Sequence, residues 1–480
     1  METLDHAVPA ATADYMPDAA ITAAIEAFFL AKKGVAADLI DVITSDGIVE
    51  LTGFTDSLLS RQRAEDIALA IRGVRAVVNE LRIRTPDVAD EELQADVTRA
   101  LTDDPATAGY NVRCTVAEGR ATPVGTVQSW AEKQLVLRVL QGVRGVRSID
   151  PDQLVLRTGE NQNSDEEMAI QIRELLDWDI RVNSALVEVR VENRVVHLAG
   201  TVGTAAERAR VEALAYQAGA ARVEARALFS AYWALNSALR RQKFAPRADE
   251  AIAQAVLDAF RYDPRVCSTE PRVRVHDGVV TLSGAVSNLR ARQEAEHDAR
   301  HVVGVREVHN WLKVRPARPR PDADVRLSIE QALTRDPYVG HFAFAVSVFN
   351  GQAYLAGRVS NQFEQEQAGA VASAVRGVTA VANWVSVARA GAPGRLPAYY
   401  RSAVPALLAG PRTDHALAEH IREHYYWSSL YCQPIEVAVK KFRATLTGTV
   451  DTADDRRRAA CDAYEAGARD VNNHLMVRES

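Results

Sequence analysis

The chain has little of what marks disulfide-rich and metal-binding proteins. Its 480 residues include only four cysteines, Cys114, Cys267, Cys432 and Cys461, and no two of them form a CxxC pair. So few cysteines are not enough for a disulfide framework. This usage is typical of a reducing compartment, where thiols stay reduced.

An excess of charge of one sign is also lacking. The 57 lysines and arginines nearly balance the 63 aspartates and glutamates, so the formal net charge is −6 at pH 7. A chain this close to neutrality has no global field that would attract nucleic acid or an anionic bilayer, although a local charged patch stays open. We therefore expect no nucleic-acid partner.

Long apolar segments are missing as well. No run of 18 apolar residues occurs, which argues against a membrane-spanning helix. The opening stretch METLDHAVPAATADYMPDAA has neither a basic start nor an apolar core of signal-peptide length. We therefore expect a cytoplasmic protein, with the periplasm or cell envelope as the alternative.

What the sequence does contain is a repeated motif. The stretch HDGVVTLSG (276–284) returns as SDGIVELTG (45–53) and as FNGQAYLAG (349–357). A composition of 47% hydrophobic and 25% charged residues is ordinary for globular protein, and the length argues for several domains. Recurrence of the motif predicts an array of similar modules.

The segment 248–314 shows the order of elements in one unit. Ile252, Val256 and Phe260 are spaced i, i+4, i+8, which predicts a helix with one apolar face. Alternating apolar and polar residues around Asp277-Gly278 predict a β-hairpin with a type I′ turn. An amphipathic helix over 287–304 and a strand over 305–314 complete an α-β-β-α-β unit.

Two glycines recur in each unit. The first closes the hairpin, where we expect a strand-to-helix turn with no space for a side chain: Gly53, Gly125, Gly200, Gly284, Gly357 and Gly448. The second lies 19 or 20 residues later: Gly73, Gly145, Gly219, Gly304, Gly377 and Gly467. In the second unit Pro123 cannot donate to a ladder, so we expect its strand to be an edge strand or to be broken there.

These patterns resemble the BON domain, a small bacterial module, most strongly in the first, fourth and fifth units. We therefore expect an α+β fold of six tandem modules, each a small three-stranded mixed sheet with two helices on one face. The expected boundaries are 18–86, 90–157, 165–228, 248–315, 322–389 and 412–478, with a helical insert at 229–247 and a Pro/Gly-rich linker at 390–411. The resemblance implies a binding module rather than an enzyme, attached to phospholipid surfaces or the cell envelope, often under osmotic stress.

Motifs for catalysis or cofactor binding are lacking. The chain contains no GxGxxG, Walker A or GxSxG sequence. Two HxxxH pairs, His297/His301 and His420/His424, place two imidazoles on one helix face, as zinc requires, or else face solvent. Because neither pair reads HExxH and no third ligand is evident, we expect solvent-facing histidines. We predict no enzyme activity, no cofactor and no metal site.

Aromatic residues are only 6% of the chain, and several gather outside the repeated core pattern. The insert 228–244 predicts a helix that lies on a membrane or packs between modules. The stretch HYYWSSLYC (424–432) suits a contact with protein or lipid, or an enlarged core of the sixth unit. The candidate interface residues are Trp233, Tyr399, Tyr400, Tyr425, Tyr426 and Trp427.

Two hypotheses of function follow. In the first, six units stack into a rigid rod or ring, with the sixth held against the fifth, and the protein self-associates or organises protein partners. In the second, the protein binds a phospholipid or envelope surface. We favour the scaffold, because charge is balanced, no targeting segment is evident and the aromatic residues concentrate where neighbouring units would meet.

Overall fold

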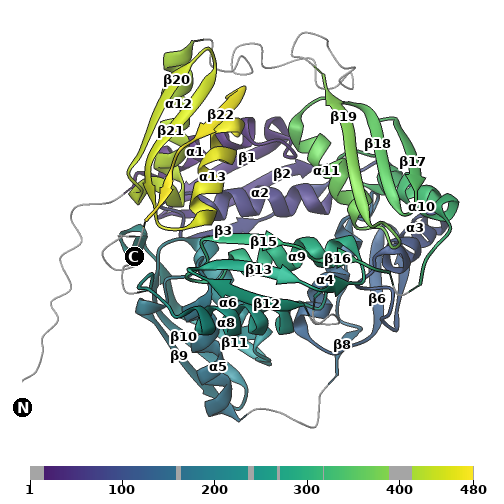
Figure 1. Ribbon diagram of the computed structural model, residues 1–480, viewed down its shortest axis with the longest axis horizontal. Coiled ribbons are helices and arrows are strands. Elements are labelled where there is room, and N and C mark those ends of the chain that lie inside the picture. Colours follow the sequence, from purple (N-terminus) through teal and green to yellow (C-terminus); the bar gives the residue numbers. More distant parts are fainter. Residues whose placement is uncertain are drawn as a thin grey trace, which may run out of the picture.

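The computed structural model describes residues 16–157, 164–235, 243–266, 271–316, 318–388 and 413–478. Over these residues the chain forms α-β-β-α-β modules, which we number repeats 1 to 6 in chain order (Figure 1). Each repeat has a small mixed sheet beside two helices. The predicted α+β fold of six tandem modules is confirmed.

The first helix of every repeat begins at an aspartate and has 14 residues. Apolar residues at every fourth position face the core, as their spacing requires; in repeat 2 Leu93, Val97 and Leu101 are all buried. The first helices are α1 (Asp18–Ala31), α3 (Asp90–Asp103), α5 (Asp165–Trp178), α8 (Asp249–Tyr262), α10 (Asp322–Arg335) and α12 (Asp414–Trp427).

The second helix of every repeat is capped by a polar side chain, which accepts a hydrogen bond from a first-turn amide that the helix itself leaves unsatisfied. The capping residues are Ser57, Ser129, Thr204, Asn288, Asn361 and Thr452. The second helices are α2 (Leu58–Ala70), α4 (Trp130–Gln141), α6 (Ala205–Gln217), α9 (Leu289–Arg300), α11 (Gln362–Ser373) and α13 (Ala453–Glu465).

The second strand is central in each sheet. It pairs antiparallel with the first strand across the hairpin and parallel with the third strand. The hairpins are β1 (Ile40–Ser45) with β2 (Ile48–Thr55), β5 (Val112–Ala117) with β6 (Arg120–Val127), β9 (Val187–Glu192) with β10 (Val195–Val202), β12 (Arg272–His276) with β13 (Val279–Ser283) and β14 (Ala285–Val286), β17 (Phe344–Phe349) with β18 (Gln352–Val359), and β20 (Ile435–Lys440) with β21 (Arg443–Val450).

The third strand is continuous in repeats 3 and 5 and divided in the others. In order, these strands are β3 (Ala76–Asn79) with β4 (Arg82–Ile83), β7 (Ser148–Ile149) with β8 (Leu154–Leu156), β11 (Arg222–Ser230), β15 (Glu307–Asn310) with β16 (Lys313–Val314), β19 (Ala380–Val387), and β22 (Asp470–Asn473) with β23 (Met476–Val477). Short 3-10 turns precede the first strand of repeats 1, 3 and 6: η1 (Ala37–Leu39), η2 (Ser184–Leu186) and η5 (Ser429–Cys432).

Pro123 does not make β6 an edge strand, as we had expected it could. β6 runs through Pro123 and is the central strand of repeat 2. The parallel ladder on its other side is interrupted, because β7 pairs with Arg120 and Ala121 and β8 resumes the pairing at Gly125. Pro123, which has no N–H to donate, lies in that gap, so the break affects the ladder rather than the strand.

Each repeat has its own hydrophobic core between its helices and one face of its sheet. In β2, Val49 and Leu51 are fully buried while Glu50 between them is exposed. This alternation follows from the two-residue period of a strand. The other face of each sheet is left to solvent or to a partner.

The predicted helical insert is wrong where the structure describes it. β11 runs into the segment as far as Ser230, and a single 3-10 turn, η3 (Tyr232–Leu235), follows. The strand is prolonged because the parallel pairing with β10 continues, and the amide of Ala231 still donates to the carbonyl of Val202. Residues 236–242 lie outside the described part of the chain.

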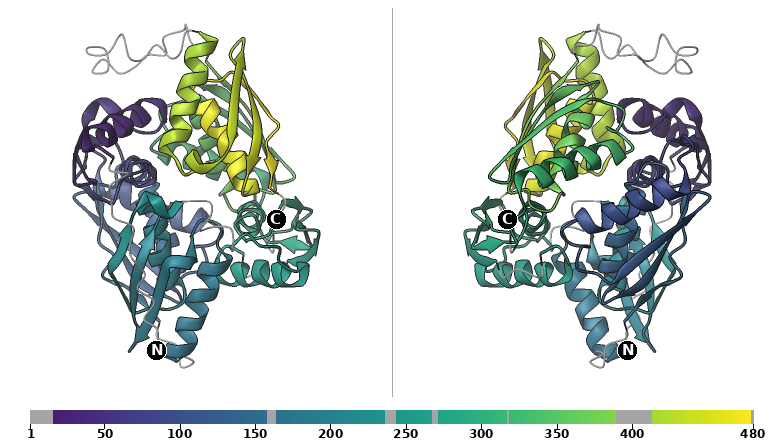
Figure 2. Two further views of the ribbon diagram at one scale, coloured as in Figure 1. Left: turned by 90° about the vertical axis from the view of Figure 1, so that its left-hand side faces the viewer. Right: turned by 90° about the vertical axis from the view of Figure 1, so that its right-hand side faces the viewer.

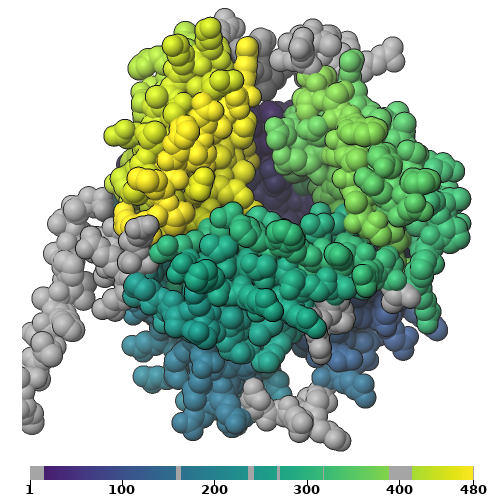
Figure 3. All heavy atoms as spheres, in the orientation of Figure 1, coloured from purple at the N-terminus to yellow at the C-terminus, as the bar shows by residue number. Residues whose placement is uncertain are grey.

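The repeats form a compact body of two layers rather than the expected rod or ring. Repeats 4, 5 and 6 make the layer toward the viewer in Figure 1 and repeats 1, 2 and 3 the layer behind it; Figure 2 shows both layers from the side. The second helices gather in the middle, where α6 contacts both α2 and α4 (Figure 1). The front layer is open between repeats 5 and 6, where repeat 1 is visible (Figure 3).

A backbone hydrogen bond of one recurring kind joins the two layers in every pair of facing repeats. The donor is the amide before the second glycine of one repeat, and the acceptor is the last carbonyl of the first helix in the facing repeat. These bonds run from Arg72 to Trp427 (2.9 Å), Arg144 to Arg335 (2.8 Å), Val303 to Trp178 (2.9 Å) and Arg376 to Asp103 (2.9 Å). Repeat 1 therefore faces repeat 6, repeat 2 faces repeat 5, and repeat 3 faces repeat 4.

A second recurring contact acts within the layers. The first residue of a second helix packs on the core of a neighbouring repeat: Leu58 of repeat 1 on repeat 2, Ala205 of repeat 3 on repeat 1, and Leu289 of repeat 4 on repeat 5. The modules are thus joined through equivalent positions. None of the described helices is both long and apolar enough to cross a membrane.

Candidate functional site

In every repeat an aspartate side chain accepts hydrogen bonds from the hairpin turn. Our sequence analysis missed this feature. In repeat 4, Asp249 accepts hydrogen bonds from the amides of Asp277 (2.8 Å) and Gly278 (3.0 Å), the two turn residues with positive φ. These bonds lower the pKa of Asp249. The equivalent aspartates are Asp18, Asp90, Asp165, Asp322 and Asp414. The signal that we overlooked is an aspartate 27 or 28 residues before each turn.

The hairpin glycines do not lie in strand-to-helix turns, so that part of the prediction is wrong. Gly53, Gly125, Gly200, Gly357 and Gly448 lie within the second strand, opposite the first residue of the hairpin's other strand, and Gly284 lies between β13 and β14. A Cβ on Gly200 would lie 1.9 Å from the carbonyl oxygen of Leu186, so a side chain does not fit there. Gly284 has positive φ, but a Cβ there would make only an ordinary contact, 3.9 Å from the amide nitrogen of Arg272. Gly357 lacks the positive φ of the others.

The histidine pairs do not face solvent as expected. His301 is buried, and its carbonyl accepts the amide of Ile180 from the facing repeat 3. His424 is buried and stacks on Phe28 of repeat 1, with ring centroids 4.5 Å apart. Of the four, only His297 is exposed. Burial lowers the pKa of both His301 and His424 to about 3, which disfavours the charged imidazolium.

A group of possible metal ligands lies at the repeat 4 turn. Asp249, His276 and Asp277 have ligand atoms within 4.8 Å of one another. The two oxygens of Asp249 already accept the turn amides, however, and the other two side chains are exposed. Their arrangement is explained by the turn, and we assign no metal to it.

Repeat 6 is held to repeat 1 by a cluster that we call the clasp: Trp427, Tyr426 and Tyr431 of repeat 6 around Arg72 of repeat 1. Trp427 is 9% exposed and packs on the core of repeat 1. The guanidinium of Arg72 lies 4.2 Å from the ring centre of Tyr426 and 3.7 Å from that of Tyr431. The expectation that these aromatic residues hold repeat 6 to repeat 5 is therefore wrong.

The other candidate interface residues have different places. Tyr425 is buried in the core of repeat 6, where its hydroxyl donates to the carbonyl of Ala459 (2.7 Å). Trp233 is 51% exposed on η3. Tyr399 and Tyr400 lie outside the described residues. The sequence cluster around Tyr425 thus divides between one module's core and a boundary between modules.

The outward face of the repeat 5 sheet is poor in charge. Phe349 and Trp384 are each 68% exposed there, and Tyr354 contacts Trp384 with ring centres 5.4 Å apart. Among its outward positions Arg358 is the one charged residue. We call this surface the repeat 5 face: Ala345, Ser347, Phe349, Gln352, Tyr354, Ala356, Arg358, Ala380, Ala382, Trp384 and Ser386.

The outward faces of other repeats are more polar. Repeat 4 carries Arg272, Arg274, His276, Glu307 and His309 beside the exposed Trp311. Repeat 3 carries Glu188, Arg190, Glu192, His197, Arg222 and Glu224. The same fold therefore presents a charged surface in two modules and an aromatic, nearly neutral one in a third.

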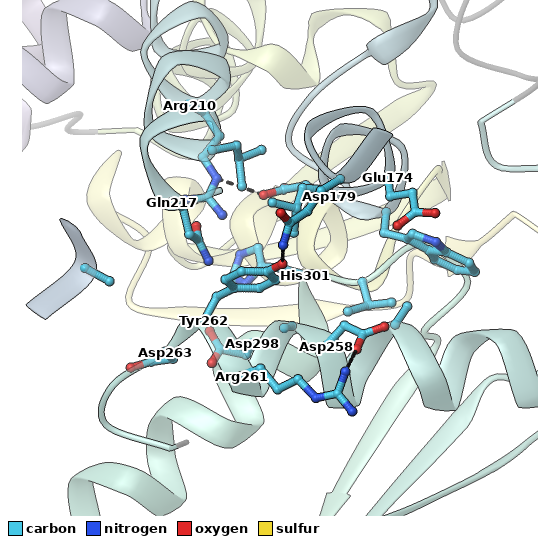
Figure 4. A pocket seen from close by; sticks show the side chains of 18 of the residues that line it. Glu174, Asp179, Arg210, Gln217, Asp258, Arg261, Tyr262, Asp263, Asp298 and His301 are labelled. Atoms are coloured by element: carbon cyan, nitrogen blue, oxygen red, sulfur yellow. Dashed lines mark hydrogen bonds and ion pairs between the residues drawn. The ribbon is translucent and has the colours of Figure 1, made fainter. Parts of the chain in front are cut away.

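A cavity of about 880 Å³ lies where repeats 2, 3 and 4 meet (Figure 4). Asp179, after α5, binds Arg181 (2.6 Å) and Arg210 (2.8 Å) on one side of it. Burial acts to raise the pKa of Asp179, but the two arginines outweigh it and lower the pKa. Our sequence analysis did not find this charged cluster, because its members come from distant parts of the chain.

A pair of carboxyl groups lies on another wall of the cavity. Burial, followed by the charge of Asp263, raises the pKa of Asp298 well above its usual range, which favours the protonated form. Burial also acts to raise the pKa of Asp263, but hydrogen bonds from Arg265 lower it overall. Asp263 and Asp298 can therefore share a proton. The cavity beside them has space for a ligand, so this arrangement of residues suits a binding site.

Comparison with known proteins gives one family across the chain. The BON domain family matches residues 17–85, 89–158, 164–227, 248–316, 321–389 and 413–479. The osmotically-inducible protein Y of Escherichia coli (strain K12) is 32% identical over 141 residues, which are 28% of this chain and 70% of that protein.

Solved structures of CdsD, described as a structural protein of the type III secretion system of Chlamydia trachomatis, show a more distant likeness. One is 16% identical, covers 48% of this chain and 93% of its own, and has a TM-score of 0.13. A second, of the C-terminal domain of CdsD, covers 49% and 100% at the same identity and TM-score. With the six family matches and the repeated α-β-β-α-β fold, the chain belongs to the BON domain family.

Proposed function

We propose that this protein is a non-enzymatic binding protein that self-associates, or organises protein partners, through the repeat 5 face. The observation that carries the proposal is the exposure of Phe349 and Trp384, each 68%, on a sheet face with one charged residue. Soluble proteins seldom leave such patches without use, and buried aromatic anchors supply much of the binding energy of protein interfaces.

The two-layer body supports this role by presenting the face on a fixed support. Repeat 5 is tied to repeat 2 by two reciprocal backbone hydrogen bonds, and Asp103 forms ion pairs with Arg320 (3.8 Å) and Arg335 (3.7 Å) across that boundary. A face that the rest of the body holds in place loses little conformational entropy when it binds. Because the face is nearly neutral, two copies can meet without repulsion between many like charges.

A phospholipid surface is the second candidate, because exposed tryptophan and phenylalanine also suit the headgroup region of a bilayer. One relative is named as osmotically inducible. In this second candidate function, the protein would therefore act in osmotic or envelope stress. Arg358 alone supplies little attraction for anionic lipid, since that attraction grows with the number of basic residues. We therefore rank protein contact above lipid contact.

Light scattering after size exclusion, with flotation on anionic liposomes, tests the proposal. We expect the wild type to form species larger than the monomer and the double variant Phe349→Ser, Trp384→Ser to be monomeric. Trp311→Ser is the matched control, since Trp311 is 70% exposed on the charged face of repeat 4. Monomeric wild type that floats with liposomes, and a double variant that does not, would replace protein contact with lipid binding.

A further inference from the structure

The cavity between repeats 2, 3 and 4 has the size of a ligand site. Its volume of about 880 Å³ falls within the range of roughly 300–1,000 Å³ that small-molecule pockets occupy. Helices from three modules supply its walls: α4 of repeat 2, α5 and α6 of repeat 3, and α8 and α9 of repeat 4. The site therefore exists only in the assembled body.

Much of the lining is apolar or aromatic. Trp130 and Trp178 line it together with Tyr262, and Ile170 keeps 48% of its surface exposed there. Small residues of α8, among them Ala251 and Ala255, leave the space open. Walls of this kind suit a ligand with an apolar body.

Arg138 lies on the cavity wall with its side chain exposed. Its guanidinium has no hydrogen bond or ion pair with any residue that the structure describes, although it lines the cavity. Burial, followed by the charges of Arg265 and Arg290, lowers the pKa of Arg138. Two acids act on Arg138: Glu294, which already binds Arg265 and Arg290 at 2.7 Å each, and Asp66 of repeat 1, which forms no ion pair with it.

Among the described residues, none of the other charged groups of the cavity forms an ion pair with Arg138. Arg181 and Arg210 share the carboxylate of Asp179, and Asp298 also acts on both of them. Five further acids line the cavity, of which Asp263 and Asp298 form the carboxyl pair described above. Asp258 pairs with Arg261 (2.7 Å), Glu167 caps α5 through Ser164, and Glu174 acts on Tyr262 rather than on Arg138 (Figure 4).

An arginine that is exposed at the wall of a cavity and has no carboxylate within ion-pair distance can bind an anion, because its planar fork of donors matches carboxylate, sulfonate and phosphate groups. We propose that the cavity binds a small organic anion, with the acidic group on Arg138 and the apolar body between the tryptophans. This site is separate from the repeat 5 face and goes beyond the proposed binding function.

Fluorescence titration with two matched probes tests the proposal. 8-Anilinonaphthalene-1-sulfonate carries an anionic group on an aromatic body, and N-phenyl-1-naphthylamine is its neutral counterpart. All proteins carry the Phe349→Ser, Trp384→Ser background, which removes the repeat 5 face as a second probe site. We expect the anionic probe to bind more tightly than the neutral one, and Arg138→Gln to weaken the anionic probe alone, by about tenfold or more.

Three controls make the result decisive. Arg326→Gln changes an arginine of α10 that pairs with Glu330 outside the cavity, and should leave both probes unaffected. Arg138→Lys keeps the charge but not the fork of donors, so it should bind the anionic probe more tightly than Arg138→Gln and less tightly than the unchanged arginine. Ala251→Trp should fill the cavity and weaken both probes. Failure of the anionic probe to bind, or equal binding to wild type and Arg138→Gln, would overturn the proposal whatever the repeat 5 face does.

Discussion

Two groups of aromatic residues in this protein have opposite surroundings. In the clasp, Trp427 is 9% exposed and lies against the core of repeat 1, with Arg72 beside its neighbours. On the repeat 5 face, Trp384 is 68% exposed and contacts Tyr354 of its own sheet. Both groups are short aromatic clusters on BON modules, yet one joins two modules and the other is available to a partner.

The difference between the clasp and the repeat 5 face indicates which positions of this fold can vary to bind a partner. Positions at the facing helix ends are constrained, because the same backbone hydrogen bond joins the layers in each facing pair. Outward sheet positions are free to vary: the residue after the strand-3 asparagine is Trp384 in repeat 5 and Trp311 in repeat 4, but His474 in repeat 6. We therefore look for binding on the sheets and for stability at the helix ends.

The largest expected effect separates the two groups directly. Trp427→Ala should lower the free energy of unfolding by about 3–5 kcal/mol, because it removes a large buried side chain at a module boundary. Trp384→Ala should change it by about 0.5 kcal/mol or less, since an exposed side chain contributes little. Urea denaturation of both variants measures the difference, and equal losses would remove the distinction between clasp and face.

Two hairpin glycines, Gly200 and Gly284, differ in how closely the backbone approaches them. Gly200→Val should cost about 2–4 kcal/mol, because positive φ and a blocking carbonyl of Leu186 act together. Gly284→Val should cost about 1–3 kcal/mol, from positive φ alone. Thermal unfolding of the two variants gives the order. A larger loss for Gly284→Val would mean that the space around the glycine does not decide the cost.

Mild acid should lower the free energy of unfolding through His424, which stacks on Phe28 at the same boundary between repeats 6 and 1 as the clasp. Its folded pKa of about 3 lies below the unfolded value of about 6.5, so its contribution to stability is full above pH 6.5 and is lost as pH falls toward 3. From pH 7 to pH 5 this amounts to about 2 kcal/mol. The buried Asp462, with its pKa raised to about 6, acts in the opposite direction, because it favours the folded state at low pH.

The variant His424→Phe separates the contribution of His424 to the pH dependence of stability from that of other groups. His424→Phe keeps a ring against Phe28 but cannot titrate. We expect the stability of the wild type relative to this variant to fall by about 2 kcal/mol between pH 7 and pH 5, since Asp462 is common to both. Urea denaturation at the two pH values measures this change. A difference that does not depend on pH would show that His424 is not buried in the folded protein.

The module could be predicted from the sequence because its signals are local. The spacing of Ile252, Val256 and Phe260 and the turn at Asp277-Gly278 each act within one element, and six copies reinforce one another. The predicted helix after repeat 3 failed because β10 offered the chain a continuing parallel ladder, which local helix propensity does not register.

The arrangement of the modules could not be predicted, because its contacts join distant residues. Trp427 packs on the repeat 1 core, and Asp103 of repeat 2 meets Arg335 of repeat 5. Arg138 reads as an ordinary surface arginine of a helix until repeat 4 closes the cavity beside it. The repeat 5 face was within reach of sequence analysis, since the alternation that predicts its strands also places Tyr354 and Trp384 on one side.

Hydroxyl-radical footprinting of the wild type at low and high protein concentration tests the central claim most directly. It reports the solvent exposure of each tryptophan in the same sample. We predict that oxidation of Trp384 falls severalfold at high concentration, while Trp311 on repeat 4 stays reactive and Trp427 in the clasp is protected at both concentrations. Trp384 that stays as reactive as Trp311 in an associated sample would contradict the assignment of the repeat 5 face as the binding surface.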